Sequence, residues 1–541
     1  MMPEEQGSDN HSKGTIPKIN PRDTYMYDRE VGKVFMQMVT KRHAQLSLKT
    51  GLKRFGDDGE AAVRKEIKSF MDFDVLIPIM ASELSRQQRA DSLPLIMTVK
   101  ERRSGEVKAR GVAGGHKDRG KIPAEDATSP TASTEALYIS CAIDAFERRF
   151  VGLLDIPSAY FHASANGRIS SVVVLEGVLV DLYLQVDPSA APKVHNTKNG
   201  KKRLYARINK ALYGHIMVSR LFWEHLSDTL DAMGFTPNPD DLCVLNKEID
   251  GRQCTVVLHV DDIKLSHVNE AVVRKVAAQL SETYGEMELR TGDVLEYCGI
   301  TLDYGEEGAV KIGAEAHIDE AIEQFGEEML TPYKTPAVTH LFTIDTECPR
   351  LSEDKRQLFH SIFAKLLWVG KKARPDILVA LSFLGKRTLV ADEDDWKKLY
   401  RLLSYLKGTK ELRLKLTVDG LSVVKWWADS SFAVHADMKS HSGGFGTLGR
   451  GAFYANSTTQ KLNTTSSTES EVVAASEMIP QALWTKSFLL HQGYNTNNIL
   501  FNQDNKAAIL LQKNGVLSRG KRSRHVDVRF FFIKDRVKGG R

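Results

Sequence analysis

The feature that most constrains this chain is an apolar run that ends in two adjacent carboxylates. Residues 255–267 read TVVLHVDDIKLSH, with Asp261 and Asp262 at the end of a β-branched segment. The pattern predicts a buried strand, a turn and a second strand. Unpaired charge beside a core is costly, so these acids need a partner. Two interpretations are open: a surface hairpin turn that carries two aspartates, or half of a metal site.

The length and composition place the chain among multidomain globular proteins. Its 541 residues are too many for one hydrophobic core, so we expect two to four domains. No apolar stretch approaches the roughly 18–20 residues that cross a bilayer, so no membrane partner is expected. Residues 1–27 are polar and carry no signal-peptide core, which predicts a disordered tail and an intracellular rather than secreted protein. The five cysteines form no C-x-x-C pair, which favours free thiols in a reducing compartment.

Basic residues are concentrated in two segments. Residues 519–541 contain nine lysines and arginines against two aspartates, and residues 98–121 contain eight against three acids. Local basic patches on a chain of net charge +5 suggest phosphate contacts at those places. A solvated charged face is an equally good interpretation of either patch alone.

Hydrophobic periodicity divides the chain into strands and helices. We expect helices over 28–76, 132–148 and 211–235, short strands over 77–112, a strand at 150–156, a strand pair around 171–187, and a strand–turn–strand over 254–266. From residue 421 the pattern changes: strands at 423–427, 443–449 and 452–456 precede a helix at 467–491, a strand at 499–503 and a helix at 505–513. This order predicts a separate α/β domain of about 120 residues.

A first group of acids lies where apolar strands end. Asp155, in VGLLDIPSAYFHA, joins the pair Asp261 and Asp262. Two-metal phosphoryl transfer needs carboxylates on rigid elements that hold two Mg²⁺ ions about 3.5–4 Å apart. The alternative is that each aspartate only forms a turn.

A second group of acids follows in the C-terminal segment. Asp429 ends a predicted strand, Asp504 lies between a strand and a helix, and Asp527 follows in RHVDVRFFF. Either Glu469 or Glu471 completes the set, because each has capping-box spacing at the start of the long helix and one of them can be a cap instead of a ligand. Four such carboxylates suit a two-metal nuclease.

Several motifs in order resemble the reverse transcriptase of copia-type LTR retrotransposons. They are GEVKARGVAGGHKDR, LLDIPSAYFHA, RINKALYGHIMVSR and LHVDDIKLS. Further on, KSHSGG, SSTESE, QDNKAAI and KRSRHVDVRFFFIKDR resemble the RNase H segment of the same family. The resemblance covers about residues 60–541. It implies an α+β multidomain protein: reverse-transcriptase fingers, palm (antiparallel sheet with helices) and thumb, followed by an RNase H-like α/β domain. The expected divisions are 1–27 (tail), 28–270 (fingers and palm), 271–420 (thumb and connection) and 421–541 (RNase H-like).

The resemblance also assigns roles to individual residues. Asp155, Asp261 and Asp262 would be the polymerase metal ligands, Tyr160 would contact the deoxyribose and exclude a 2′-hydroxyl, and Lys108 and Arg110 would face the triphosphate. Asp429, Glu471, Asp504 and Asp527 would be the nuclease metal ligands, with Glu471 preferred over Glu469. Arg519, Lys521, Arg522, Arg524, His525 and Arg529 would lie along the nucleic acid, with His525 as an aid to product release or proton transfer.

The implied function is RNA-directed DNA polymerase with ribonuclease H activity, a nucleotidyltransferase and an endonuclease in one chain. Each site would take two Mg²⁺ ions, with Mn²⁺ as an alternative, and the partners would be an RNA template, a DNA primer, the RNA–DNA hybrid and dNTPs. The expected location is a cytoplasmic particle or the nucleus. HIMVSR at residues 215–220 departs from the family's K-Q-A-P-R, and His259 replaces a common tyrosine. The alternatives are an inactive relic that only binds nucleic acid and a nuclease-only protein.

Overall fold

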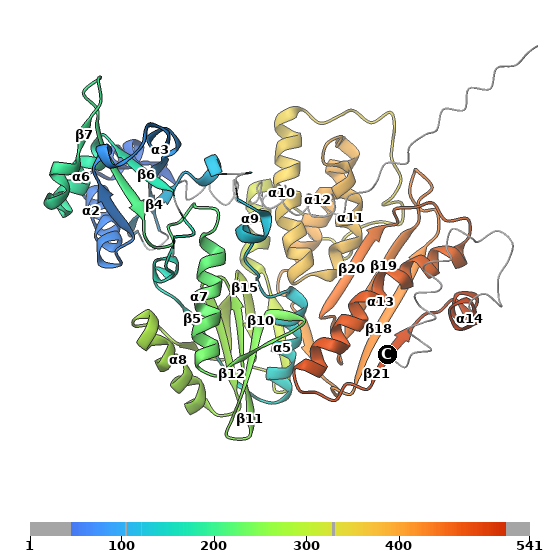
Figure 1. The fold of residues 1–541 in the computed structure, drawn as a ribbon. Helices are drawn as coiled ribbons and strands as arrows, with labels where there is room; N and C mark the ends of the chain where they lie inside the picture. Colours follow the sequence, from blue (N-terminus) through green and yellow to red (C-terminus); the bar gives the residue numbers. More distant parts are fainter. Residues whose placement is uncertain are drawn as a thin grey trace, which may run out of the picture.

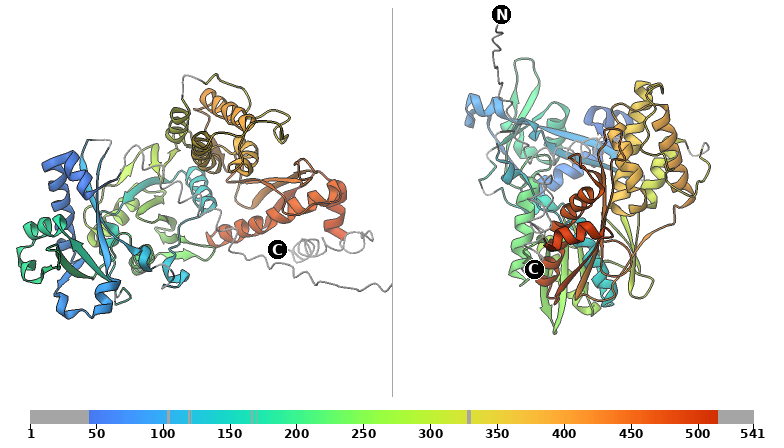
Figure 2. Two further views of the ribbon diagram at one scale, coloured as in Figure 1. Left: turned by 90° about the horizontal axis from the view of Figure 1, so that it is seen from above. Right: turned by 90° about the vertical axis from the view of Figure 1, so that its right-hand side faces the viewer.

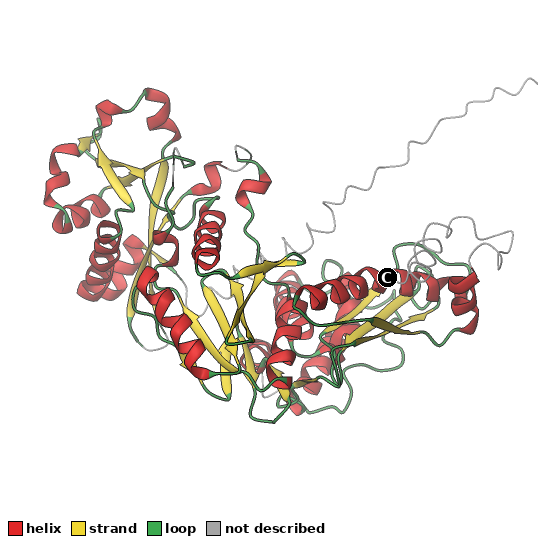
Figure 3. Ribbon diagram, turned by 60° about the horizontal axis from the view of Figure 1, so that its bottom comes forward, coloured by secondary structure: helices red, strands yellow, loops and turns green. Residues whose placement is uncertain are grey.

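The computed structural model describes residues 45–514, apart from 103–104, 119, 121, 166, 170 and 327–329. Within these residues the strands form four sheets, of seven, six, four and four strands, each associated with helices (Figures 1 and 3). The predicted tail at 1–27, Asp527 and the basic residues from Arg519 to Arg529 lie outside the described residues. A search of the described helices finds none with the length and apolar character to cross a membrane.

The N-terminal sheet carries the basic segment predicted from the sequence. Its strands are β1 (Leu46–Ser47), β2 (Leu76–Ile79), β3 (Leu93–Glu101), β4 (Val107–Ala113), β6 (Val172–Glu176), β7 (His195–Asn196) and β8 (Lys202–Ile208). Helix α2 (Leu48–Asp72) packs on β3 and β4 through its buried Val63, Ile67 and Phe70. Strands β3 and β4 form an antiparallel hairpin, as the alternating pattern predicts.

The predicted strand pair around 171–187 is wrong in its second half. Strand β6 is followed by a helix, α6 (Val178–Val186), which begins after Gly177 at φ 59°. The run VLVDLYLQV is short and almost wholly apolar, so its periodicity does not distinguish a strand from a buried helix. The predicted helix over 211–235 also begins late, at Val218 of α7 (Val218–Ala232).

The central sheet is antiparallel and contains the hairpin that carries Asp261 and Asp262. Its order is β13-β5-β12-β11-β10-β9, with β5 (Phe150–Asp155), β9 (Thr236–Asn238), β10 (Asp241–Ile249), β11 (Arg252–His259), β12 (Asp262–His267) and β13 (Arg290–Thr291). Helix α8 (Glu270–Tyr284) packs on β5 and β12. Helix α5 (Thr134–Phe146) begins after its N-cap Ser133, as predicted. Both α8 and β13 therefore belong with the central sheet, although they follow residue 270.

A third sheet and a group of helices connect the central sheet to the C-terminal unit. The strands are β14 (Val294–Tyr297), β15 (Ile300–Asp303), β16 (Ala309–Gly313) and β17 (Leu414–Thr417), and the helices are α9 (Glu315–Phe325), α10 (Glu353–Lys372), α11 (Leu378–Arg387) and α12 (Glu393–Gly408). Seen from above, helices α10 to α12 lie to one side of the line from the N-terminal unit to the C-terminal unit (Figure 2).

The C-terminal unit has the βββαβα order that the sequence predicts. Strands β18 (Val423–Ser431), β19 (His441–Thr447) and β20 (Tyr454–Thr459) are antiparallel, and β21 (Asn498–Asn502) pairs parallel to β18. A parallel pair needs a crossover, which α13 (Ser467–His491) supplies before α14 (Lys506–Asn514). Helix α13 lies close on the sheet, since a Cβ at Gly444 would be 2.5 Å from the Met478 sulfur.

Buried polar contacts join the C-terminal unit to the central sheet. The Arg149 guanidinium donates to Glu147, to the Thr255 hydroxyl at 2.9 Å and to Gln253 at 3.1 Å. It also donates to the Tyr494 hydroxyl at 3.0 Å, and Tyr494 in turn donates to Glu147 at 2.7 Å. The arginine is buried, so these contacts tie the segment that follows α13 to the central sheet.

Candidate active sites

The hairpin between β11 and β12 holds Asp261 and Asp262 in a tight turn. His259 pairs with Asp262, which leaves Val260 and Asp261 as the two turn residues. Val260 has φ 59°, a left-handed conformation that is rare for a β-branched side chain. Such backbone strain costs about 1–3 kcal/mol and concentrates at functional sites. The surrounding strands therefore hold the two acids in a conformation that the isolated turn would not favour.

A third acid lies directly opposite this turn. Asp262 on β12 is the register partner of Asp155 on β5, and the Ile156 amide donates to the Asp261 carbonyl at 3.3 Å. Directly opposed like charges destabilise a sheet, so the arrangement calls for a cation. Burial and the neighbouring Asp261 carboxylate raise the pKa of Asp155. Burial, Asp261 and Asp155 likewise raise the pKa of Asp262.

The two opposed acids face an open cleft of about 430 Å³. Its lining also includes Glu286, Glu288 and Arg290. The Arg290 charge offsets part of the rise in the pKa of both Asp155 and Asp262. Sequence reasoning missed Arg290, because it lies on the edge strand β13 and reaches the acids only through its pairing with β5.

Lys108 and Arg110 lie two residues apart on β4 and line one small pocket, as their strand spacing implies. The same pocket is lined by Lys100 and Arg102, which the sequence analysis did not single out. Lys100 pairs directly with Lys108 across the hairpin. Burial and the charges of Arg102 and Arg110 lower the pKa of Lys108. Four basic side chains that line one pocket favour an anion there, although Arg102 is also paired with Glu106 at 3.1 Å.

Tyr160 lies between the acids and the basic hairpin. It is carried by a 3₁₀ turn, Ala159–His162, that follows β5. Its ring centroid is 4.7 Å from that of Tyr213, and the Arg110 guanidinium lies 4.3 Å from the Tyr213 centroid. Its hydroxyl hydrogen-bonds the Ser219 hydroxyl at 3.1 Å. Tyr213 and Ser219 were also missed, although their position in ALYGHIMVSR, beside a family motif, offered a signal.

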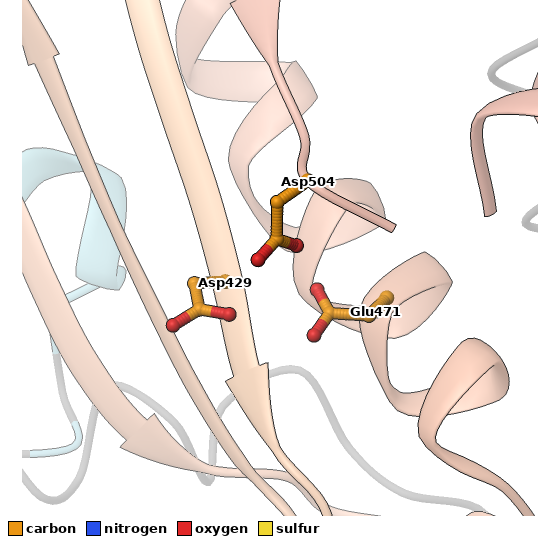
Figure 4. Close-up of side chains that lie close together, drawn as sticks. All are labelled: Asp429, Glu471 and Asp504. Carbon is orange, nitrogen blue, oxygen red and sulfur yellow. The ribbon is translucent and has the colours of Figure 1, made fainter. Parts of the chain in front are cut away.

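The second group of acids converges on the C-terminal sheet. Oxygens of Asp429 on β18, Glu471 on α13 and Asp504 after β21 lie within 4.8 Å of one another, and the three carboxylates point together (Figure 4). In the described part of the chain this is the only such group of three or more ligating side chains, so Asp155, Asp261 and Asp262 are less tightly gathered.

Glu471 has the features of a metal ligand. It is buried, and its Oε1 accepts from the Ser430 amide at 3.2 Å, while its buried Oε2 has no hydrogen-bond partner among the described residues. Burial raises its pKa, the Ser430 hydrogen bond lowers it, and the Asp429 charge raises it again. An unpartnered carboxylate oxygen beside two exposed acids fits a hard cation such as Mg²⁺.

Glu469 has a different role at the start of the same helix. One of its carboxylate oxygens accepts from the Thr465 amide at 2.6 Å and from the Thr465 hydroxyl at 2.7 Å. Its own backbone amide donates to the hydroxyl of the N-cap residue Ser466 at 3.2 Å. The Glu469 carboxylate is therefore engaged at the start of the helix, beside the N-cap Ser466, and the geometry favours Glu471 as the ligand. The fourth predicted ligand, Asp527, and the nucleic-acid residues Arg519, Lys521, Arg522, Arg524, His525 and Arg529 lie outside the described residues.

Comparison with known proteins agrees with the resemblance. Residues 82–339 match the reverse transcriptase (RNA-dependent DNA polymerase) family. The chain is 24% identical over 512 residues to the Retrovirus-related Pol polyprotein from transposon TNT 1-94 of Nicotiana tabacum, covering 89% of this chain and 36% of the relative. It is 23% identical over 443 residues to the corresponding polyprotein from transposon RE2 of Arabidopsis thaliana, covering 80% and 28%. Among solved structures, the foamy viral protease-reverse transcriptase in complex with RNA/DNA hybrid aligns with a TM-score of 0.46 and 11% identity, covering 89% of this chain and 52% of that one.

The segment that matches the reverse transcriptase family, residues 82–339, contains the opposed acids and the strained hairpin. Over most of its length the chain is similar to the Pol polyproteins of copia-type retrotransposons from plants. It spans only about a third of the length of these two plant relatives. The predicted family and the predicted α+β fold class are confirmed.

Proposed function

We propose that this chain is an RNA-directed DNA polymerase that extends a DNA primer on an RNA template with dNTPs. The observation that supports the proposal best is the pairing of Asp155 with Asp262 across β5 and β12, with Asp261 in the strained turn beside them. This arrangement lies within the segment that matches the reverse transcriptase family.

In this proposal different residues of the chain bind the metal ions, the triphosphate and the sugar of the nucleotide. Asp155, Asp261 and Asp262 would hold two Mg²⁺ ions. These ions would supply charge neutralisation at the phosphates and acidify the primer hydroxyl. The basic hairpin residues Lys108 and Arg110, with Lys100 and Arg102 beside them, would bind the triphosphate. The ring of Tyr160 would contact the deoxyribose.

Primer extension on a homopolymer RNA template tests this proposal. The full chain with Mg²⁺ should incorporate dNTP, and Asp261→Asn should lose that activity without unfolding. Absence of incorporation by the natural chain would refute the polymerase proposal, and equal incorporation by Asp261→Asn would refute the assigned site.

We propose a ribonuclease H activity as the second function of the same chain. The supporting observation is the convergence of Asp429, Glu471 and Asp504, with Glu471 Oε2 left unpartnered. Asp527 would complete the Mg²⁺ ligands and the basic residues around it would bind the hybrid. Cleavage of a labelled RNA–DNA hybrid should be lost in Asp504→Asn. Cleavage without any primer extension would instead identify a nuclease-only protein.

The domain division is part of the same proposal. We place the end of the fingers and palm after residue 291, because α8 and β13 pack with the central sheet. The thumb and connection extend to residue 420, between β17 and β18, and the nuclease unit follows. The site of action would be intracellular, in a cytoplasmic particle or the nucleus.

A further inference from the structure

The side chain that holds Tyr160 in place comes from a stretch that departs from the family pattern. Ser219 lies in the first turn of α7, within HIMVSR. Its hydroxyl is 3.1 Å from the Tyr160 hydroxyl, and either oxygen can donate the proton. This side-chain contact is partly buried, so solvent does not freely replace it.

The Tyr160 ring is also held by other aromatic rings. The Tyr213 ring meets it at a centroid distance of 4.7 Å and an interplanar angle of 50°, and the Phe222 ring meets it edge to face at 5.7 Å. Tyr213 is in turn covered by the Arg110 guanidinium. These apolar contacts restrict the position of the ring. The hydrogen bond to Ser219 adds a directional restraint at the end of the phenol.

We propose that Ser219 is a positioning residue that fixes Tyr160 and thereby sets the discrimination between deoxyribonucleotides and ribonucleotides. The inference rests on the proposed polymerase function. A ring held at both its face and its hydroxyl cannot move aside for a 2′-hydroxyl. Without the Ser219 hydroxyl, the phenol loses its fixed end, and the ring can shift toward α7 to admit the larger sugar.

Single-nucleotide extension with dCTP and with CTP measures this effect directly. We expect Ser219→Ala to reduce the ratio of kcat/KM for dCTP to kcat/KM for CTP by about 3- to 10-fold, the loss of one partly buried hydrogen bond. Tyr160→Phe removes the same bond from the other side and should reduce the ratio to a similar extent. The double variant should be no less selective than the less selective of the two single variants. Ser219→Thr should restore much of the selectivity.

The same helix offers a matched control. The Ser227 hydroxyl on α7 is buried and has no hydrogen-bond partner in the described structure, so Ser227→Ala should leave the ratio unchanged. If Ser219→Ala does not fold, as judged from its melting curve, Tyr160→Phe and Ser219→Thr provide the same test. Extension by the natural chain with an unchanged ratio in Ser219→Ala overturns this inference alone. No extension by the natural chain overturns the polymerase proposal and this inference with it.

Discussion

Replacing Glu471 by glutamine should stabilise the metal-free protein and abolish its stabilisation by Mg²⁺. Glu471 is buried on α13, and its oxygen lies within 4.8 Å of oxygens of Asp429 and Asp504. Among the described residues its Oε2 has no hydrogen-bond partner, so the negative charge of the side chain is only partly offset, by Ser430 and Gln503. Glutamine keeps the size of the side chain, removes the charge, and adds an amide that can donate to the neighbouring aspartates.

The magnitude follows from the spacing of the charges. Two unit charges 4.8 Å apart repel by about 0.9 kcal/mol in water and by about 3.5 kcal/mol at an effective dielectric constant of 20. Asp429 and Asp504 are exposed, so the lower value is the better guide for each pair. Glu471 takes part in two such pairs, and we therefore expect a gain of about 1–3 kcal/mol in the free energy of unfolding of the C-terminal unit.

Thermal and urea unfolding of the full chain, in EDTA and in excess Mg²⁺, would measure both effects. The natural protein should unfold at a lower temperature in EDTA than Glu471→Gln, and Mg²⁺ should raise the transition of the natural protein only. Equal or lower stability of Glu471→Gln in EDTA would refute the repulsion argument. A Mg²⁺ response retained by the variant would refute the ligand assignment.

Glu469→Gln is the matched control on the same helix turn. Glu469 accepts two hydrogen bonds from Thr465 and lies at the helix N-terminus, where negative charge is favourable. Its replacement should cost about 0.5–1 kcal/mol and leave the Mg²⁺ response intact. The two neutral substitutions, two residues apart, should thus change stability in opposite directions.

Three further predictions concern the polymerase site and the contact between units. Asp262→Asn should lower primer extension by about 100-fold or more and spare hybrid cleavage, whereas Asp504→Asn should do the reverse. Burial and neighbouring acids raise the pKa of Asp155 and Asp262, so both carboxylates bind protons at a higher pH than free aspartate does. Because protons compete with Mg²⁺ for these carboxylates, the Mg²⁺ concentration for half-maximal extension should rise as the pH falls. Arg149→Met should cost about 3–5 kcal/mol in urea unfolding, and Tyr494→Phe about 1 kcal/mol.

Each of these predictions has an outcome that contradicts it. Loss of both activities in either aspartate variant would mean that the two sites do not act separately. A Mg²⁺ requirement independent of pH would contradict the prediction that protons compete with Mg²⁺ for Asp155 and Asp262. Unchanged stability of Arg149→Met would show that the buried contacts do not hold the C-terminal unit on the central sheet.

Much of the fold could be predicted because the signals were local. The βββαβα order of the C-terminal unit and the strand–turn–strand around Asp261 follow from hydrophobic periodicity and turn residues. The segment at 178–186 could not be predicted in the same way, because an all-apolar run is compatible with a buried strand and a buried helix. This segment forms the helix α6, which packs against α2, β6 and β8 in the N-terminal unit.

The sequence pointed to the acidic residues of the candidate sites but not to the neighbouring side chains that contact or position the site residues. Asp155, Asp261 and Asp262 could be found because each follows a strand and belongs to a motif. Arg290 belongs to no such motif, and Ser219 lies within one but is not one of its acids. They join the sites through a strand pairing and a helix start that only the folded chain brings into place.

The sequence by itself indicated the family resemblance, most of the order of the elements and the candidate acids. The tertiary structure decided which acids meet. Register between β5 and β12 sets Asp155 opposite Asp262, and a slip of one residue would have turned one of them to the other face. Glu469 and Glu471 have equivalent spacing to a cap, but residues two apart on a helix point about 200° apart. The packing of α13 on β18 therefore directs Glu471 to Asp429 and leaves Glu469 as the cap.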